Sequence, residues 1–140
     1  MKIAFHVIYT VLALNFLIPV LGYIFDGPGT IATWAWLGEF LGGPPYVHSE
    51  DSRFWRVLAI ANVATLGFCC VLLQVDLRRW FPVLVPLVFL KSCAAIGFGV
   101  VWLLEPYPQY LAAALFDGLT VAAMIFFAVQ GRRALAEGAG

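Results

Sequence analysis

The sequence predicts an all-α integral membrane protein, an antiparallel four-helix bundle with a short interfacial helix in its outer loop. Composition is the first reason: 63% of the 140 residues are hydrophobic, 11% are charged, and the mean hydropathy is +0.93. Soluble domains are about 45–50% apolar and about 25% charged, so this excess indicates that lipid is the solvent. The second reason is that the apolar residues are concentrated in four separate segments.

Each apolar segment reaches the length of about 20 residues that a helix needs to cross the hydrocarbon layer. Backbone polar groups in lipid must be satisfied within the segment, which favours helices over single strands. We expect the spans near residues 3–25, 54–75, 80–104 and 108–130, in a single membrane domain covering residues 1–140. The first segment exceeds the roughly 7–15 apolar residues of a signal peptide, so we expect a retained helix.

The connections between the spans predict how the helices are arranged. The second and third spans are joined by "VDLRRW", and the third and fourth by "EPYPQY"; such short connections favour antiparallel neighbours. The long outer loop, residues 26–53, contains the chain breakers "DGPG" and "GGPPY". Because tryptophan favours the headgroup region, we expect the short helix at residues 30–41 to lie in the membrane interface. Its apolar stripe is formed by Ile31, Trp34, Leu37 and Leu41.

The distribution of lysine and arginine predicts the orientation in the membrane. With four spans, the N-terminus, the second loop and the C-terminus lie on one side of the bilayer. That side carries Lys2, Arg78, Arg79, Arg132 and Arg133. The other side carries only Arg53 and Arg56. By the positive-inside rule, we expect both termini in the cytoplasm.

One strongly polar residue interrupts each span: Asn15, Asn62, Lys91 and Asp117. Counted from the outer ends of their helices at 1.5 Å per residue, Lys91 lies roughly 20 Å deep and Asp117 roughly 14 Å deep. The same count gives about 15 Å for Asn15 and about 12 Å for Asn62. A long lysine side chain can cover a difference of several ångströms, so we expect a Lys91–Asp117 pair with both asparagines nearby.

Two interpretations of this polar cluster stay open at the level of sequence. A lysine–aspartate pair with two asparagines can lock the helices in register without any ligand. Ionisable residues inside a membrane nevertheless mark functional sites by default, which favours a ligand or proton site. The sequence supports both interpretations equally.

Motifs typical of a resident metal or cofactor are missing from the sequence. Cys69, Cys70 and Cys93 lie within apolar segments and lack zinc-ligand spacing. His6 and His48 are expected on opposite sides of the membrane, which argues against a bis-histidine haem. The formal net charge of zero gives no electrostatic reason to expect nucleic acid as a partner. We therefore expect no catalytic constellation, metal, cofactor or nucleic-acid partner.

Three short motifs carry a resemblance to known proteins: "DLRRW" after the second span, "LVPLVFLKSCAAIG" in the third and "LAAALFDG" in the fourth. They resemble small bacterial four-helix membrane proteins of the DoxX-like kind and neighbouring uncharacterised families. The resemblance covers most of the chain at the level of architecture. It implies a four-helix bundle in the bacterial inner membrane. Fold-level analogy is weak support for an activity, so the resemblance assigns no function.

Three functions are compatible with these features. We favour a non-catalytic membrane protein, either an accessory subunit or a bundle that binds a lipid or small apolar ligand. Its partners would be the lipid bilayer and another membrane protein or a second copy of the chain. The first alternative is a small proton-coupled transporter with Lys91–Asp117 as its coupling site. The second is a membrane enzyme acting on a lipid or quinone, with Asp117 as proton donor.

Overall fold

A computed structural model describes residues 2–45 and 53–137 of the chain. Residues 46–52 of the predicted outer loop, which include His48, lie outside these described residues. Within them the chain is all-helical, as the sequence predicts. The elements in chain order are α1 (Lys2–Phe25), α2 (Gly27–Phe40), α3 (Arg53–Val75), α4 (Leu77–Trp80), the 3-10 turn η1 (Phe81–Val83), α5 (Leu84–Leu104) and α6 (Pro108–Glu137).

Four helical stretches in the described part of the chain are long and apolar enough to cross a membrane. They are Ile3–Phe25, Arg56–Val75, Leu77–Leu104 and Pro108–Glu137. The number and order of the predicted spans are therefore confirmed. Length and composition identify this chain as one with four candidate membrane spans.

Three boundaries differ from the sequence prediction, each for a local reason. The short helix predicted from residue 30 begins at Gly27, because Asp26 caps it and Pro28 lies in the first turn, where its missing N–H is tolerated. The third span was expected from residue 80, but the regular helix α5 begins at Leu84, after the 3-10 turn that contains Pro82. Proline lacks a backbone N–H, which disfavours a continuous α-helix through this position. Helix α6 continues to Glu137 instead of ending at residue 130. The added turns contain Ala, Leu, Arg and Glu, which are strong helix formers. The two arginines and the glutamate end the apolar pattern there without ending the helix.

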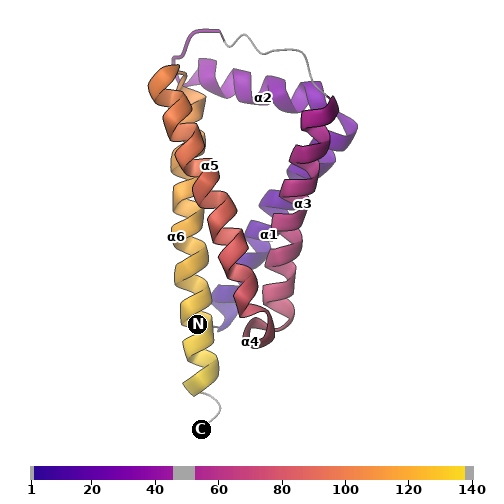
Figure 1. Cartoon of the computed structure of the whole chain (residues 1–140), viewed down its shortest axis with the longest axis vertical. Coiled ribbons are helices and arrows are strands. Elements are labelled where there is room, and N and C mark those ends of the chain that lie inside the picture. The colour runs from indigo at the N-terminus through magenta and orange to yellow at the C-terminus, as the bar shows by residue number, and fades with distance from the viewer. Residues whose placement is uncertain (1, 46–52, 138–140) are drawn as a thin grey trace.

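The long helices pack in two pairs. Helix α5 packs along α6, α1 packs along α3, and α1 also contacts α6 and so joins the pairs. Helix α2 lies across one end of the molecule, where it contacts α1 and α6 (Figure 1). We call this the α2 end. Helix α1 begins and α6 ends at the opposite end, which we call the terminal end (Figure 1).

Two aspartates cap the helices that follow the sharp turns of the chain. Asp26 stands alone between α1 and α2, and its carboxylate accepts a hydrogen bond from the backbone N–H of Gly29 at 3.0 Å. Asp76 likewise caps α4, accepting from the backbone N–H groups of Arg78 at 3.0 Å and Arg79 at 3.1 Å. An aspartate at this position satisfies amides that have no partner within the helix. Helix α2 can therefore turn across the end of the molecule directly after α1.

The buried core is concentrated toward the terminal end. Its members come from every long helix: Phe5, Tyr9, Leu12, Ala13, Phe16, Leu66, Cys70, Leu73, Leu77, Leu84, Leu87, Met124 and Ala128. The Tyr9 hydroxyl donates to the Met124 carbonyl at 2.8 Å and so links α1 to α6 inside this core. Gly131 lets α6 approach α4 closely, since a Cβ at this position would lie 2.9 Å from the Leu77 side chain. Small residues at such contacts are typical of helix packing in lipid.

Helices α3 and α5 diverge toward the α2 end (Figure 1). The short connection through α4 and η1 holds the two helices together at the terminal end, and they diverge from there (Figure 1). Leu73 and Leu66 are buried on one face of α3, whereas Asn62, one turn further on the same face, is exposed. This face of α3 is therefore packed at the terminal end and exposed at the α2 end. We call the surroundings of Asn62 and Trp34, between the diverging parts of α3 and α5, the open region.

Candidate functional site

An ion pair between Lys91 and Asp117 joins α5 to α6. The lysine Nζ contacts the aspartate Oδ1, and the two side chains are 13% and 6% exposed. Each charge alone at the centre of a spanning helix would cost roughly 2.5–3.5 kcal/mol. Their contact gives each a partner of opposite sign. The structure therefore brings together the two charged residues that depth counting in the sequence paired.

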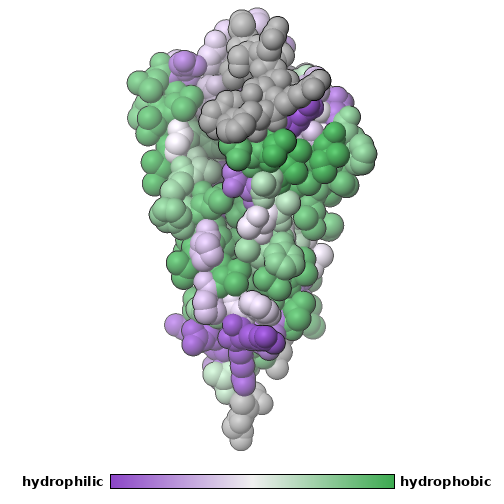
Figure 2. All heavy atoms as spheres, turned by 45° about the vertical axis from the view of Figure 1, so that its right-hand side comes forward, coloured by the Kyte–Doolittle hydropathy of each residue, from purple (hydrophilic) through white to green (hydrophobic). Residues whose placement is uncertain are grey.

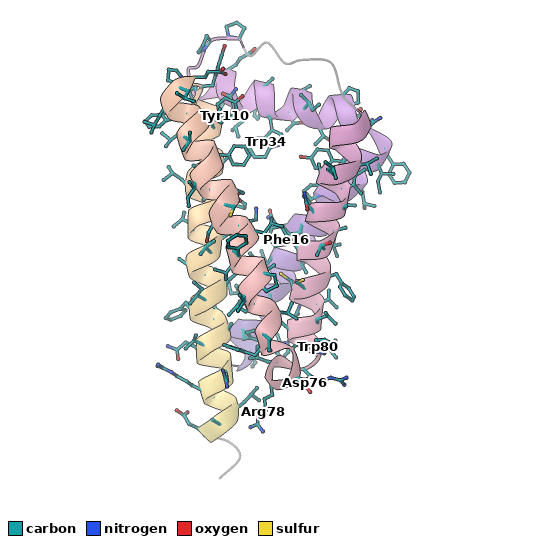
Figure 3. All side chains as sticks on the ribbon, in the orientation of Figure 1. Phe16, Trp34, Asp76, Arg78, Trp80 and Tyr110 are labelled. Atoms are coloured by element: carbon teal, nitrogen blue, oxygen red, sulfur yellow. The ribbon has the colours of Figure 1, made fainter. Side chains whose placement is uncertain are left out.

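The pair lies at the edge of the core, beside an aromatic ring from α1. The Lys91 Nζ is 5.1 Å from the centroid of the Phe16 ring, within the range of a cation–π interaction. Figure 3 shows Phe16 in the middle of the molecule, below the region where the interior opens toward α2. Thr120, 5% exposed, lies close to one turn after Asp117 on the buried face of α6. The pair thus stands between the packed core and the open region.

The two asparagines of the predicted cluster are not hydrogen-bonded to this pair. Within the described part of the chain, neither Asn15 nor Asn62 makes a side-chain hydrogen bond; Asn15 is half-buried and Asn62 is exposed. Asn15 lies next to Phe16 in sequence, so it is turned about 100° away from that residue on α1. Asn62 instead shares its face of α3 with buried Leu66. Asn62 is therefore an unpaired amide on a face that turns inward.

Helix α2 covers the open region with an aromatic side chain. Trp34, 44% exposed, projects from α2 toward the middle of the molecule (Figure 3). The spacing in sequence agrees, because one face of α2 carries Gly27, Ile31, Trp34 and Gly38, and both glycines are buried. The predicted stripe included Trp34 but not the two glycines, which are the buried positions of this helix. Trp34 therefore lies on the α2 side of the open region, whereas Phe16 belongs to the buried core on the other side of it.

Gln109 is a buried polar residue that sequence reasoning missed. It is the second residue of α6, is 4% exposed, and contacts Gly38 of α2. Neither its Nε2 nor its Oε1 has a hydrogen-bond partner in the described structure. A buried polar group without a partner costs about 1–3 kcal/mol. Nothing in the sequence marked this position, since a glutamine at a helix start usually faces solvent.

The chemistry of this region is that of a neutral, amphipathic site. The Lys91 and Asp117 charges balance, Trp34 supplies exposed aromatic surface, and Asn62 supplies a free donor and acceptor. Phe16 packs behind the lysine as part of the buried core. No group of three or more histidine, cysteine or acidic side chains that could hold a metal occurs among residues 2–45 and 53–137. The three cysteines are free thiols, with Cys70 buried and Cys93 exposed. The arrangement can hold hydrocarbon against the Trp34 ring and hydrogen-bond a polar group at Asn62.

Compared with known proteins, the chain matches no family model, no curated protein and no solved structure. The resemblance to DoxX-like proteins therefore stays a prediction. The case for function depends on the geometry of the site alone.

Proposed function

We propose that this protein is a non-catalytic antiparallel four-helix bundle of the bacterial inner membrane, with both termini in the cytoplasm. In this proposal the open region between α3 and α5 binds a neutral amphipathic molecule that enters from the bilayer. The ligand has an apolar chain, which lies against the exposed ring of Trp34, and a small polar group, which hydrogen-bonds to Asn62. Lys91 and Asp117 form the floor of the site.

The orientation is supported by the exposed charges at the terminal end. Arg78, Arg79, Arg132 and Arg133 are exposed there, and Figure 2 shows a hydrophilic band below an extended hydrophobic surface. Basic residues at one boundary of the spans favour the cytoplasmic side.

The interfacial position of α2 is supported by aromatic residues at the opposite boundary. Trp36 and Phe40 are exposed on α2, and their rings stack with centroids 5.4 Å apart. Aromatic side chains of this kind favour the headgroup region of the bilayer. An α2 helix in the interface would cover the open region from the water side and leave access from the lipid.

Asn62 is the observation that carries the proposal. An amide exposed at membrane depth without a protein partner would be expensive in hydrocarbon, because no water is there to hydrogen-bond to it. Its neighbour Thr65 differs, since the Thr65 hydroxyl donates to the Ala61 carbonyl of its own helix at 2.8 Å. The unpaired amide on the inward face therefore calls for a polar group supplied by a ligand.

The ion pair favours binding over catalysis or proton transport. Because the Asp117 carboxylate contacts Lys91, its charge is already balanced by the protein. A charged ligand would leave an uncompensated charge beside this neutral ion pair, so we propose a neutral ligand. The half-exposed aromatic surface of Trp34 adds to the apolar lining.

The proposal is tested by extracting bound lipids from protein purified in a mild detergent and identifying them by mass spectrometry. We expect the wild type to retain a neutral amphiphile and the Asn62→Leu variant to lose most of it, about tenfold if one good hydrogen bond of about 1.4 kcal/mol is removed. Thr65→Val is the matched control, because its hydroxyl is already satisfied within α3. Equal ligand content in wild type and Asn62→Leu would refute the proposal.

A further inference from the structure

A second region of chemical interest lies on the outer face of α6, away from the ion pair. A shallow, open hollow of about 390 Å³ lies on one face of this helix, lined by Ala122, Ile125, Phe126, Val129, Gln130 and Arg133. These residues recur at helical spacing along one side of α6. The opposite side carries the buried residues Thr120, Met124, Ala128 and Gly131. The hollow therefore faces outward, toward the surroundings of the protein.

The dimensions of this hollow match one leaflet of a bilayer. Its lining extends from Ala122 to Arg133, which is about 16 Å along a helix at 1.5 Å per residue. Half of a hydrocarbon layer about 30 Å thick is about 15 Å. The first four lining residues are apolar, and the polar ones, Gln130 and Arg133, come at the terminal end. A single acyl chain with its headgroup at Arg133 has this length and this polarity.

Arg133 differs from the other arginines at the terminal end. The Arg132 guanidinium lies over the Phe81 ring at 4.4 Å, Arg79 lies over the Trp80 ring at 5.1 Å, and Arg78 donates to the Leu135 carbonyl. Arg133 is exposed and has no such contact within the part of the chain that the structure describes. Glu137 lies one turn further along α6 and makes no ion pair with it among these residues.

We propose that this hollow binds an anionic phospholipid. One acyl chain lies along Ala122, Ile125, Phe126 and Val129, and the Arg133 guanidinium binds the phosphate. Charge complementarity selects this occupant, because the planar guanidinium matches phosphate oxygens and the apolar wall excludes a free anion from the rest of the hollow. The Gln130 amide lies at the level of the glycerol esters, where it can donate a hydrogen bond. The site is separate from the open region between α3 and α5.

The test compares two lipids on the full chain in detergent, by native mass spectrometry and by thermal unfolding. The probes are palmitoyl-oleoyl phosphatidylglycerol and the zwitterionic phosphatidylcholine with the same chains. A basic residue near the membrane surface is worth about 1 kcal/mol toward anionic lipid, so we expect about a fivefold preference for phosphatidylglycerol. In Arg133→Gln we expect that preference to fall to about equal binding.

Arg132→Gln is the matched control, since the neighbouring guanidinium is held over Phe81. It should keep the preference, as should Asn62→Leu, so failure here and failure of the proposed function can be told apart. Because the readout is a ratio of two lipids on one variant, a general loss of stability does not affect it. Equal binding of both lipids by the wild type would overturn the proposal, and so would an equal loss of preference in Arg132→Gln. Stabilisation of the same size by inorganic phosphate alone would overturn the assignment to a lipid.

Discussion

Along one face of α3, the side chains of Leu73 and Leu66 are 0% and 4% exposed, whereas Asn62, one turn closer to α2, is exposed. The same helix face therefore belongs to a packed core at the terminal end and to an open region at the α2 end. The difference comes from the neighbours, because α5 approaches α3 where the short α4 connection joins them and diverges above it. The packed core lies at the terminal end, and the proposed ligand site lies at the α2 end.

The ion pair at the boundary of the two regions should give the largest effect on stability. Replacing one member, in Asp117→Leu, leaves the Lys91 charge without a partner, and we expect a loss of roughly 3–5 kcal/mol. Adding Lys91→Met to this variant should recover most of that loss, since neither charge is then present. Unfolding in mixed micelles, followed by tryptophan fluorescence, measures both. A double variant as unstable as the single one would show that the pair is not coupled.

A core leucine and a lipid-facing leucine test the difference between the two ends directly. We expect Leu73→Ala to destabilise the protein by about 2 kcal/mol, the low end of the usual range, because in lipid the loss is mainly of packing contacts. Leu103, 75% exposed near the α2 end, is the matched control, and Leu103→Ala should change stability by less than about 0.5 kcal/mol. The same micelle unfolding assay applies. Equal losses in the two variants would mean that the core is not concentrated at the terminal end.

A substitution at the contact between α2 and α6 should have the smallest effect on stability, and it should stabilise the protein. Gln109→Leu removes a buried amide without partners, so we expect a gain in stability of about 1 kcal/mol. Gln74→Leu is the control. The Gln74 side chain accepts a hydrogen bond from the Thr10 hydroxyl at 2.8 Å, so its removal should lower the stability. A loss of stability in Gln109→Leu, measured as above, would contradict the expected cost of the unpaired amide.

More of the fold than of the candidate site could be predicted from the sequence. Hydropathy alone located four spans, and depth counting alone paired Lys91 with Asp117. Depth says nothing about rotation around the helix axis, however, so it could not show that Asn15 and Asn62 stay outside the hydrogen-bonded pair. Phe16 beside the lysine and Gln109 beneath α2 were not expected at all, because an apolar residue in a span and a polar one at a helix start are unremarkable in sequence.

What can be read from this chain without its structure is the position of each segment along the membrane normal, because hydrocarbon excludes charge and backbone polar groups over a known thickness. Which face of each helix meets another helix was decided only by the tertiary structure. In water, a polar face and an apolar face reveal that rotation. In lipid, both the core-facing and the lipid-facing sides are apolar, as with buried Leu73 and exposed Leu103, so the pattern of hydrophobicity no longer distinguishes them.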